Sequence, residues 1–559
     1  MRILFASPIT PFTLSEDGRD PLDPFTGQLS PTQGPFVMTM HSHYWAFYMI
    51  AENVNAHSCV LEHPSLAQFE DEVRKGYDVL GLQVNWNTLA QTAEMVQRAR
   101  RIAPEMRIVI GGYAIPQILD PLPPDRDAAA VIREGTHEMC HEEGVHFMRR
   151  LIGDGPVDRP ITQFTLPRSG SYLSAVGPVA RGIGGRPILV SLGCPAGCDF
   201  CNTSAFFHRK KFRVAEPDQA QAFMRHHLLH DGNERIQVEL FDEDLFWDPS
   251  YSRTLGKRLR DDPVTMGKVG YFTFGSVRTL SKFDPEELVA NGLAAVWIGV
   301  ESTLDDVLRS RAHLGKRKGK DVAALFASLQ ELGVSTIGSL ILGFDFHTPE
   351  NVHRDIDAFV ALSPTISQVT PLIPCAGTAL YERMKKEGRL DPRFGWTVAG
   401  GFQANPPVAP LHFDWPALSK VIDDANQRLY RENGPSALKH LESALRGHLR
   451  LRSHADPVLR ARGAVLGETA RAQYPMLEAV RDNAPSDRVR ERALAAADRW
   501  REAFGEPDDM QRTLGRALSE RVRAFAEAPP APVTTNAPPT RWTYYRPGAA
   551  PEVVKQAAA

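Results

Sequence analysis

Ser191-Leu-Gly-Cys-Pro-Ala-Gly-Cys-Asp-Phe-Cys-Asn-Thr203 is the stretch of sequence that decides the fold. It places Cys194, Cys198 and Cys201 within eight residues, in a chain that has six cysteines among 559 residues. Thiolates are the usual ligands of iron-sulfur clusters, and three on one short loop can converge on a single cluster. Three ligands leave one iron of a four-iron cluster open to a substrate or a cofactor.

A structural zinc site is the alternative for these cysteines. Such sites normally use four protein ligands, often arranged as two pairs. No second Cys-x-x-Cys or His pair follows the loop at a suitable distance. A disulfide framework does not suit a long chain with an odd local trio of cysteines. The pattern therefore favours a cluster, and zinc stays as the weaker alternative.

The cysteine loop follows a predicted strand and opens a long βα alternation that ends near residue 400. Pro187–Ser191 is apolar, and Gly193 and Gly197 allow a tight loop after it. Strands are predicted at 188–192, 235–241, 269–275, 294–300, 336–342 and 366–371. Six parallel strands with helices between them indicate an open, partial barrel rather than a closed barrel of eight.

The first 155 residues show a second βα alternation, which predicts a doubly wound, flavodoxin-like parallel sheet. Strands are predicted at 2–6, 78–83, 107–112 and 128–135, and helices at 41–51, 92–100 and 138–151. Ligands of such sheets bind at the carboxyl ends of the strands.

The remaining segments are assigned by composition. Residues 156–185 are rich in Pro, Gly and Ser and are predicted to be a linker, and 401–526 are predicted to form a helical domain that caps the barrel mouth. The last segment, 527–559, is rich in Pro and Ala and is predicted to be a flexible tail. Its aromatic patch Trp542–Tyr545 offers docking on the body as the alternative.

Charge and hydropathy exclude several classes of protein. Lys plus Arg number 64 and Asp plus Glu 67, a net charge of −3, which does not favour nucleic-acid binding. The apolar run at the amino terminus is too short for a signal peptide, and no stretch of about 18 apolar residues is present to span a bilayer. We therefore expect a cytoplasmic protein, in a compartment that keeps thiols reduced.

The cysteine loop after a first barrel strand, with Phe200 just before the last cysteine, resembles the radical S-adenosylmethionine (SAM) enzymes. Ile341–Asp345 and Thr370–Tyr381 resemble the barrel end of the class that carries an N-terminal cobalamin-binding domain. The resemblance covers residues 1 to about 400. It implies that the three cysteines hold a 4Fe-4S cluster and that SAM chelates the open iron. It also implies a flavodoxin-type or ferredoxin-type electron donor, whose electron cleaves SAM to a 5'-deoxyadenosyl radical.

The resemblance assigns SAM contacts to the ends of later strands. Phe200 is expected near the adenine and Glu301 at the ribose hydroxyls, and the remaining contacts are Asp242, Glu243, Asp244, Ser276 and Arg278. The three consecutive carboxylates are expected to meet the SAM amino group, because burying them is costly unless they face a cation or water. An acidic helix N-cap, favoured by the helix dipole, is the alternative.

The same resemblance places a corrin at the strand ends of the first domain. The residues expected to position it are Gln83, Asn85, Trp86, Asn87, Gly111, Gly112, Tyr113 and Gly135. No Asp-x-His-x-x-Gly motif occurs in this domain to supply an axial histidine; a partial match, Asp345-Phe-His347, lies in the barrel. A domain that no longer binds cobalamin remains the alternative. Cys375 is expected to be an inert buried thiol, with a position facing substrate as the alternative.

The resemblance implies a cobalamin-dependent radical SAM enzyme, with methylation of an unactivated carbon of a small-molecule substrate as the leading hypothesis. The cofactors carry such chemistry, and the protein supplies placement and exclusion of water. A radical cyclase, a ring-rearranging enzyme or an epimerase without methyl transfer is the second hypothesis. A cobalamin or cluster sensor with a helical output domain is the third. Substrate identity and oligomeric state do not follow from the sequence.

Overall fold

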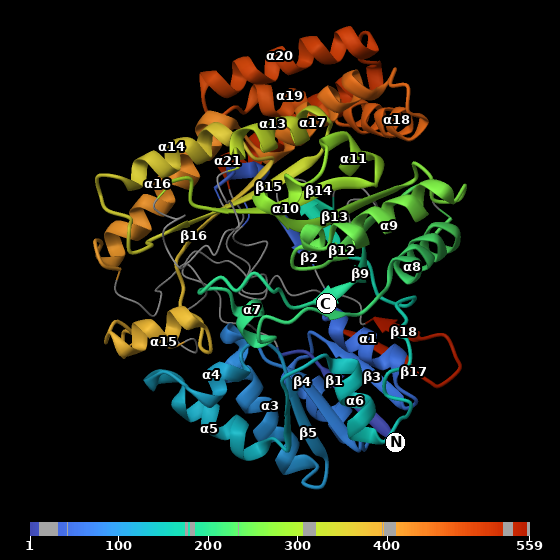
Figure 1. Cartoon of the computed structure of the whole chain (residues 1–559), viewed down its shortest axis with the longest axis vertical. Coiled ribbons are helices and arrows are strands. Elements are labelled where there is room, and N and C mark those ends of the chain that lie inside the picture. The colour runs from blue at the N-terminus through green and yellow to red at the C-terminus, as the bar shows by residue number, and fades with distance from the viewer. Residues whose placement is uncertain are drawn as a thin grey trace.

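The computed structural model describes residues 1–9, 29, 32–41, 43–173, 177–178, 185–232, 234–305, 320–393, 395, 410–528 and 540–555. Three parts follow one another along the longest axis of the molecule: an N-terminal α/β part, a central sheet with its helices, and a bundle of C-terminal helices (Figure 1). None of the described helices combines the length and the apolar character that a membrane span requires.

The N-terminal part is built on a parallel sheet in the order β3-β1-β4-β5-β6. The strands are β1 (Arg2–Ala6), β3 (His57–Glu62), β4 (Val79–Gln83), β5 (Arg107–Gly111) and β6 (Glu138–Cys140). This is the flavodoxin-like order, and it confirms the predicted fold class. Helices α1 (Trp45–Asn53), α2 (Leu66–Val73), α3 (Leu89–Ile102), α4 (Ile115–Leu119), α5 (Arg126–Gly135) and α6 (Gly144–Ile152) belong to the same part.

Two predictions for this sheet are wrong. Residues 128–135, predicted as a strand, belong to helix α5, which buries Ala129 and Ile132. Three of the five apolar residues in that run are alanine, the residue with the highest helix propensity. The predicted helix from residue 138 instead begins with strand β6, and α6 starts only at Gly144. Strand β3 was not predicted at all.

The C-terminal segment is also predicted wrongly, because residues 540–555 are not a free tail. Strand β17 (Arg541–Tyr545) pairs antiparallel with β3, and β18 (Glu552–Lys555) pairs with β17. The Trp542 indole Nε1 donates to Glu72 Oε2 at 2.9 Å. Without this pairing β3 would present an open sheet edge, which natural proteins usually cover. The Pro-rich residues 529–539 and the last four residues lie outside the described residues.

We expect Tyr545→Ala to lower the free energy of unfolding by about 3 kcal/mol, the usual cost of truncating a buried aromatic side chain. Tyr545 is 6 % exposed and packs in the core beside α1 and α6. Chemical denaturation followed by tryptophan fluorescence measures the change. Val553→Ala on β18 is the control, because Val553 is 45 % exposed. Equal stability of the two variants would contradict the packing of β17 and favour the prediction of a flexible tail.

The central part is an open sheet of six parallel strands in the order β16-β15-β14-β13-β12-β9, as predicted. The strands are β9 (Arg186–Leu189), β12 (Ile236–Phe241), β13 (Val269–Ser276), β14 (Leu293–Glu301), β15 (Ser335–Leu342) and β16 (Ile366–Pro371). Helices α8 (Pro217–His230), α9 (Pro249–Asp261), α10 (Val277–Leu280), α11 (Pro285–Ala290), α13 (Val322–Glu331), α14 (Val352–Leu362) and α15 (Ala379–Lys386) alternate with them. The largest hydrophobic core lies between this sheet and its helices and continues into the C-terminal bundle.

The predicted linker contributes strands to a small separate sheet. Strands β7 (Gly170–Leu173) and β8 (Gly177–Pro178) join β2 (Met38–His41). Residues 174–176 and 179–184 of that linker lie outside the described residues. Leu29 forms an isolated bridge with Gln368, so the N-terminal segment touches the outer strand β16 of the barrel.

Most of the described C-terminal helices do not cap the barrel mouth. The helices of this region are α16 (Trp415–Asn433), α17 (Ser436–Leu451), α18 (Pro457–Ala472), α19 (Tyr474–Asp482), α20 (Asp487–Phe504) and α21 (Asp509–Glu527). Several of their contacts reach the amino ends of the barrel strands: the Ser335 hydroxyl bonds His440 Nδ1 at 2.8 Å, and Arg235 Nη2 donates to Glu468 Oε1 at 2.9 Å. The prediction fails because the outer faces of α11 and α13 offer the apolar surface that α17 and α18 bury.

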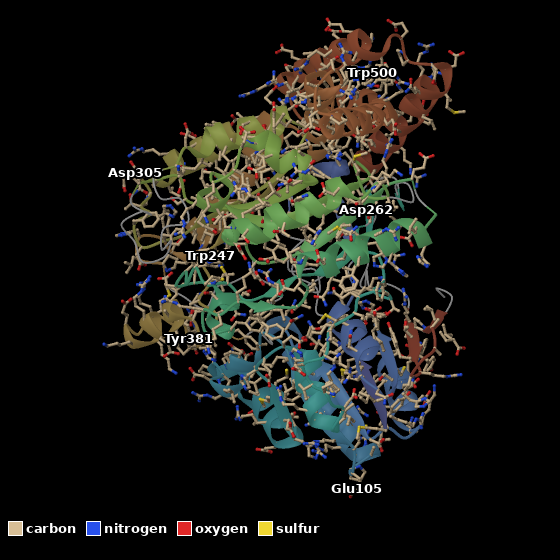
Figure 2. The ribbon with its side chains drawn as sticks, turned by 45° about the vertical axis from the view of Figure 1, so that its right-hand side comes forward. Glu105, Trp247, Asp262, Asp305, Tyr381 and Trp500 are labelled. Carbon is tan, nitrogen blue, oxygen red and sulfur yellow. The ribbon has the colours of Figure 1, made fainter. Side chains whose placement is uncertain are left out.

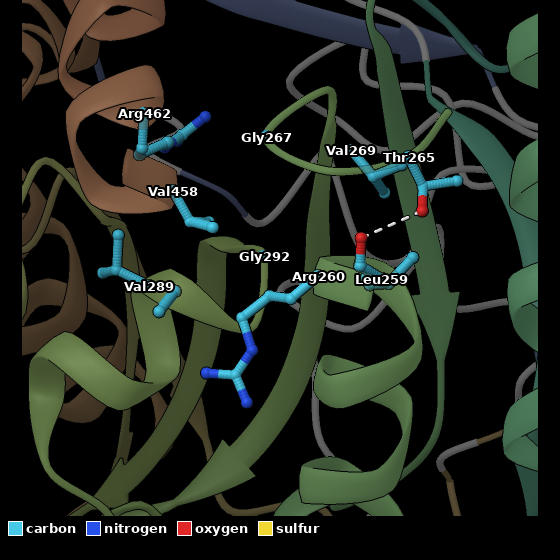
Figure 3. Close-up of a pocket in the computed structure, with 10 residues that line it drawn as sticks. Leu259, Arg260, Thr265, Gly267, Val269, Val289, Gly292, Val458 and Arg462 are labelled. Carbon is cyan, nitrogen blue, oxygen red and sulfur yellow. Dashed lines mark hydrogen bonds between the residues drawn. The ribbon is translucent and has the colours of Figure 1, made fainter. Parts of the chain in front are cut away.

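A small pocket marks this junction (Figure 3). Gly267, Gly292 and Val269 line it from the amino ends of β13 and β14, and Val458 and Arg462 line it from α18. Its volume of about 20 Å³ suits a single water molecule. The pocket therefore lies at the end of the barrel opposite the cysteine loop and does not belong to the candidate site.

Candidate active site

The carboxyl ends of the barrel strands face the carboxyl ends of the N-terminal sheet, with α7 (Asn202–Phe206) and α15 beside the N-terminal part (Figure 1). Lys385 Nζ of α15 donates to Asp120 Oδ2 at 2.5 Å, and Tyr381 lies at the same junction (Figure 2). The Tyr113 ring stands edge-on to Phe206, with 5.3 Å between ring centroids. Parts of the chain that are separate in sequence thus meet where ligands of parallel sheets bind.

The cysteine loop follows strand β10 (Ser191–Leu192), and the Ser204 side chain bridges two points of it. The Ser204 hydroxyl donates to the carbonyl of Cys194 at 2.8 Å and accepts from the amide of Gly197 at 3.1 Å. Gly193 has a φ of +78°, and a Cβ there would lie 2.2 Å from the carbonyl oxygen of Lys210. Only glycine fits such a position without moving the backbone.

Two of the three loop cysteines, Cys194 and Cys198, are buried, and Cys201 is half-buried. Three cysteines on one fixed loop at a strand end suit a cluster with three protein ligands. The described ranges contain no set of three or more His, Cys, Asp or Glu side chains gathered closely enough to bind a single metal ion.

Phe200 of the loop and Cys375 both make contacts around the cysteines. The centroid of the Phe200 ring is 6.2 Å from that of Phe344, so this part of the loop meets the segment after β15. Cys375 lies close enough to Cys201 for the two thiols to interact: burial first, and then Cys201, raise the pKa of Cys375 to about 12. A protonated thiol at neutral pH agrees with the expected inert role of Cys375.

The acidic strand end after β12 divides into separate roles. Asp242 is buried and accepts from Lys211 Nζ at 2.6 Å and from the Ser191 hydroxyl at 2.6 Å. Its carboxylate therefore already faces a cation of the protein, and the SAM contact stays a prediction for Asp242. The sequence patterns do not single out Lys211. The one feature that indicates a role for it is its position shortly after the cysteine loop and α7.

Asp244 is also committed to the barrel. It accepts from the hydroxyls of Ser276 at 3.0 Å and Thr279 at 2.8 Å, and Ser276 caps α10. The predicted cofactor contact Ser276 is therefore a helix cap in the structure. Arg278 lies over the ring of Trp247, a residue labelled in Figure 2, at 4.9 Å.

Glu243 is the carboxylate of this trio that lies near Tyr113 of the N-terminal part. Burial is the main cause that raises the pKa of Tyr113, and the charge of Glu243 raises it further. A hydrogen bond with the side chain of Thr203 acts in the opposite direction and lowers it. Glu243 is half-buried, whereas its two neighbours are buried. The structure thus brings Glu243, Tyr113 and the end of the cysteine loop together.

We expect the stability of the protein to fall as pH rises from about 4 to about 6 through Asp244. Burial raises its pKa to about 6, with Asp242 adding to the shift against the bonds from Thr279 and Ser276. In that window the folded protein keeps a proton that the unfolded chain has lost, which is worth up to about 3 kcal/mol. Asp244→Asn should remove this slope from denaturation curves taken between pH 4 and 7. An unchanged slope in the variant would contradict the assignment.

Glu301 ends strand β14 in an unusual backbone conformation. Its φ is +62°, a left-handed value that side chains other than glycine rarely adopt, and it is 5 % exposed. The pairing of β14 with β15 shifts register between Gly299 and Glu301. Such strain costs about 1–3 kcal/mol and persists mainly where function requires the position. This is an independent reason to keep Glu301 as a site residue.

Most of the residues predicted to position a corrin lie at the carboxyl edge of the N-terminal sheet. Gln83 and Gly111 end β4 and β5, and Asn85, Trp86 and Asn87 follow β4. Gly112 has a φ of +124°, and a Cβ there would meet the carbonyl oxygen of Val84 at 2.3 Å. Trp86 also packs with Ala376 and Tyr381 from the barrel side.

Gly135 does not belong to this edge. It ends α5, its carbonyl accepts from Arg100 Nε at 2.8 Å, and a Cβ would lie 2.2 Å from Val96 Cγ1. Its role is the close packing of α5 on α3. The prediction is wrong because it rests on a strand that is a helix.

The fold and the site thus define a partial barrel whose three-cysteine loop faces a flavodoxin-like domain. No protein-family model matches the chain. The chain is similar to a bacteriochlorophyllide d C-12(1)-methyltransferase of Chlorobaculum tepidum, with 28 % identity over 213 residues, 38 % of this chain and 44 % of that relative. It is also similar to an uncharacterized methyltransferase of Pyrococcus horikoshii, with 23 % identity over 205 residues, 36 % of this chain and 42 % of that relative. Each match spans less than half of the relative's length.

Among solved structures, the chain is similar to the radical SAM methyltransferase TsrM from Kitasatospora setae, solved with cobalamin and a 4Fe-4S cluster bound. The two are 15 % identical with a TM-score of 0.49, and the match covers 84 % of this chain and 99 % of that one. Both sequence relatives are methyltransferases by name.

Proposed function

We propose that this protein is a cobalamin-dependent radical SAM methyltransferase that acts on an unactivated carbon of a small molecule. The observation that carries the proposal is the position of Tyr113, on the loop after β5, beside Thr203, Glu243 and Cys201. A cysteine loop suited to a cluster and a sheet edge suited to a flat ligand therefore lie next to each other.

Cys194, Cys198 and Cys201 would hold the cluster. When bound, the cluster with SAM supplies a carbon radical that can remove hydrogen from an unactivated position. The protein fixes the loop through Ser204 and buries two of the three thiols. Burial also excludes water from the reacting groups.

Glu301 and Glu243 are the carboxylates we assign to SAM. The strained conformation of Glu301 fixes its carboxylate at the end of β14, where ribose hydroxyls can donate to it. Glu243 lies on the loop after β12, where an ammonium group would pair with its charge. Asp242 and Asp244 instead support this loop from below through Lys211, Ser276 and Thr279.

The edge formed by Trp86, Gly112 and Tyr113 would hold the corrin. Two buried amide oxygens next to this edge, Gln91 Oε1 and Gln117 Oε1, have no hydrogen-bond partner in the structure. Buried polar atoms normally find partners, so these acceptors suit the amide side chains of a corrin. The residues present therefore fit the group.

Anaerobic purification with cluster reconstitution and added cobalamin tests the proposal. We expect visible absorption of both a 4Fe-4S cluster and bound cobalamin, and cleavage of SAM under a chemical reductant. Formation of 5'-deoxyadenosine without S-adenosylhomocysteine would favour a cyclase or an epimerase. Cluster binding without SAM cleavage would favour a sensor. Failure to bind cobalamin would remove the proposed mechanism.

A further inference from the structure

A buried network of hydrogen bonds fixes the two residues that follow Glu301 in the chain. Asp355, on α14, is fully buried and accepts from the Ser302 hydroxyl and from the amide and hydroxyl of Thr303. These two residues directly follow Glu301 in the sequence. Ser302 also bonds the amide of Leu304 at 3.1 Å, so one carboxylate fixes the turn that leaves β14.

The fourth donor to Asp355 comes from the segment after β15. His347 is fully buried, and its Nε2 lies 3.0 Å from Asp355 Oδ2. Its Nδ1 accepts from the amide of Gly343 at 3.1 Å, so the proton of the neutral ring must be on Nε2, which donates to Asp355. Burial raises the pKa of Asp355, but the bonds from His347, Ser302 and Thr303 outweigh burial and lower it.

His347 connects this chain to the cysteine loop. The centroid of its ring lies 5.7 Å from that of Phe344 and 4.7 Å from that of Phe346. The rings of Phe344 and Phe200 are 6.2 Å apart between centroids. Phe200 immediately precedes Cys201. A single set of contacts therefore runs from the end of β14, through α14 and the segment after β15, to the loop expected at the adenine.

We propose that Asp355 and His347 are positioning residues that hold Glu301 and Phe200 in register for SAM. This inference rests on the proposed function. The left-handed conformation of Glu301 is unfavourable for a side-chain-bearing residue, so neighbouring bonds must maintain it. Asp355 supplies them with a charge that strengthens each hydrogen bond. Its own position depends on the fixed tautomer of His347.

The test is binding of SAM to the anaerobically reconstituted full chain, measured by isothermal titration. We expect Asp355→Asn to keep the cluster absorbance and to raise the Kd for SAM at least tenfold. The asparagine NH2 group is a donor, and it would replace an oxygen that accepts two hydrogen bonds from Ser302 and His347 or from Thr303. The double variant Glu301→Ala with Asp355→Asn should bind SAM no more weakly than Glu301→Ala alone. Such non-additivity identifies a residue that acts through another.

Glu442→Gln is the matched control. Glu442 is a buried carboxylate of α17 that Arg492 Nε holds at 2.9 Å, at the far end of the molecule. We expect it to lower the melting temperature at least as much as Asp355→Asn while leaving the Kd for SAM unchanged. His347→Gln, which keeps a donor for Asp355, should bind SAM more tightly than His347→Ala.

The outcomes separate the two proposals. If the reconstituted wild type does not bind SAM, the proposed function fails and this inference fails with it. If the wild type binds SAM and Asp355→Asn binds it equally well, only the positioning role is overturned. A parallel loss in Glu442→Gln would also overturn it, by reducing the effect to general instability. Should Asp355→Asn not fold, Ser302→Ala removes one donor only and should still raise the Kd severalfold.

Discussion

Cys201→Ala is expected to abolish both the charge-transfer absorbance of the reconstituted cluster and the formation of 5'-deoxyadenosine from SAM. Cys201 is one of three thiols on a loop that Ser204 and two left-handed glycines hold in place. Two remaining cysteines are too few to hold a four-iron cluster, because such clusters depend on their thiolate ligands. Visible spectroscopy and chromatography of the SAM products measure the two losses.

Cys375→Ala and Cys59→Ala are the controls for this prediction. Cys375 is buried near Cys201, and Cys59 is buried in β3 of the N-terminal sheet. Both variants should keep the cluster and the cleavage of SAM. Loss of the cluster in Cys375→Ala would mean that the thiol after β16 belongs to the ligand set. Retention in Cys201→Ala would falsify the assignment of the loop.

Lys211→Met should lower the free energy of unfolding by about 3–5 kcal/mol, the usual cost of removing one partner of a buried ion pair. The Lys211 ammonium donates to Asp242 at 2.6 Å and to the carbonyl of Asp244 at 2.9 Å, and the side chain of Asp242 is fully buried. Without the ammonium, the charge of Asp242 loses its closest cation. Urea denaturation of the anaerobically prepared protein measures the loss.

A double variant separates the pair from its environment. Asp242→Leu combined with Lys211→Met should lose less stability than the sum of the two single changes, since neither charge is then left unpaired. Asp242→Asn should also destabilise, whereas Asp244→Asn above pH 6 should not, since the native carboxylate of Asp244 is disfavoured there. If Asp242→Asn left the unfolding curve unchanged and weakened SAM binding instead, the sequence-based role of Asp242 would be restored.

The strands of the barrel were predictable because their pattern is local. Strand β14, for example, is an almost continuous apolar run that ends at Glu301, and parallel strands that are buried on both faces have this pattern. The cysteine loop was predictable for a similar reason, because all three ligands are adjacent in the chain. The prediction of a strand at 128–135 is wrong because an alanine-rich apolar run fits a helix and a buried strand equally well.

The division of labour among the acidic residues was not predictable. The three acidic residues 242–244 are consecutive in the chain. Only the fold brings Lys211 to donate to Asp242, and Ser276 and Thr279 to donate to Asp244. The network of Asp355 and His347 was hidden as well, since its members come from three separate segments. The partial motif Asp345-Phe-His347 drew attention to the histidine for a different reason.

The sequence by itself determined the two βα parts, the thiolate loop and the chemistry that such a loop supports, because each depends on residues close together in the chain. The tertiary structure decided what surrounds that loop. It placed most of the C-terminal helices at the far end of the barrel and strand β17 on β3, where an open edge needed a partner. It also placed Tyr113 beside Cys201 and tied Glu301 to Asp355. Contacts of that kind depend on packing between distant segments, which no local pattern records.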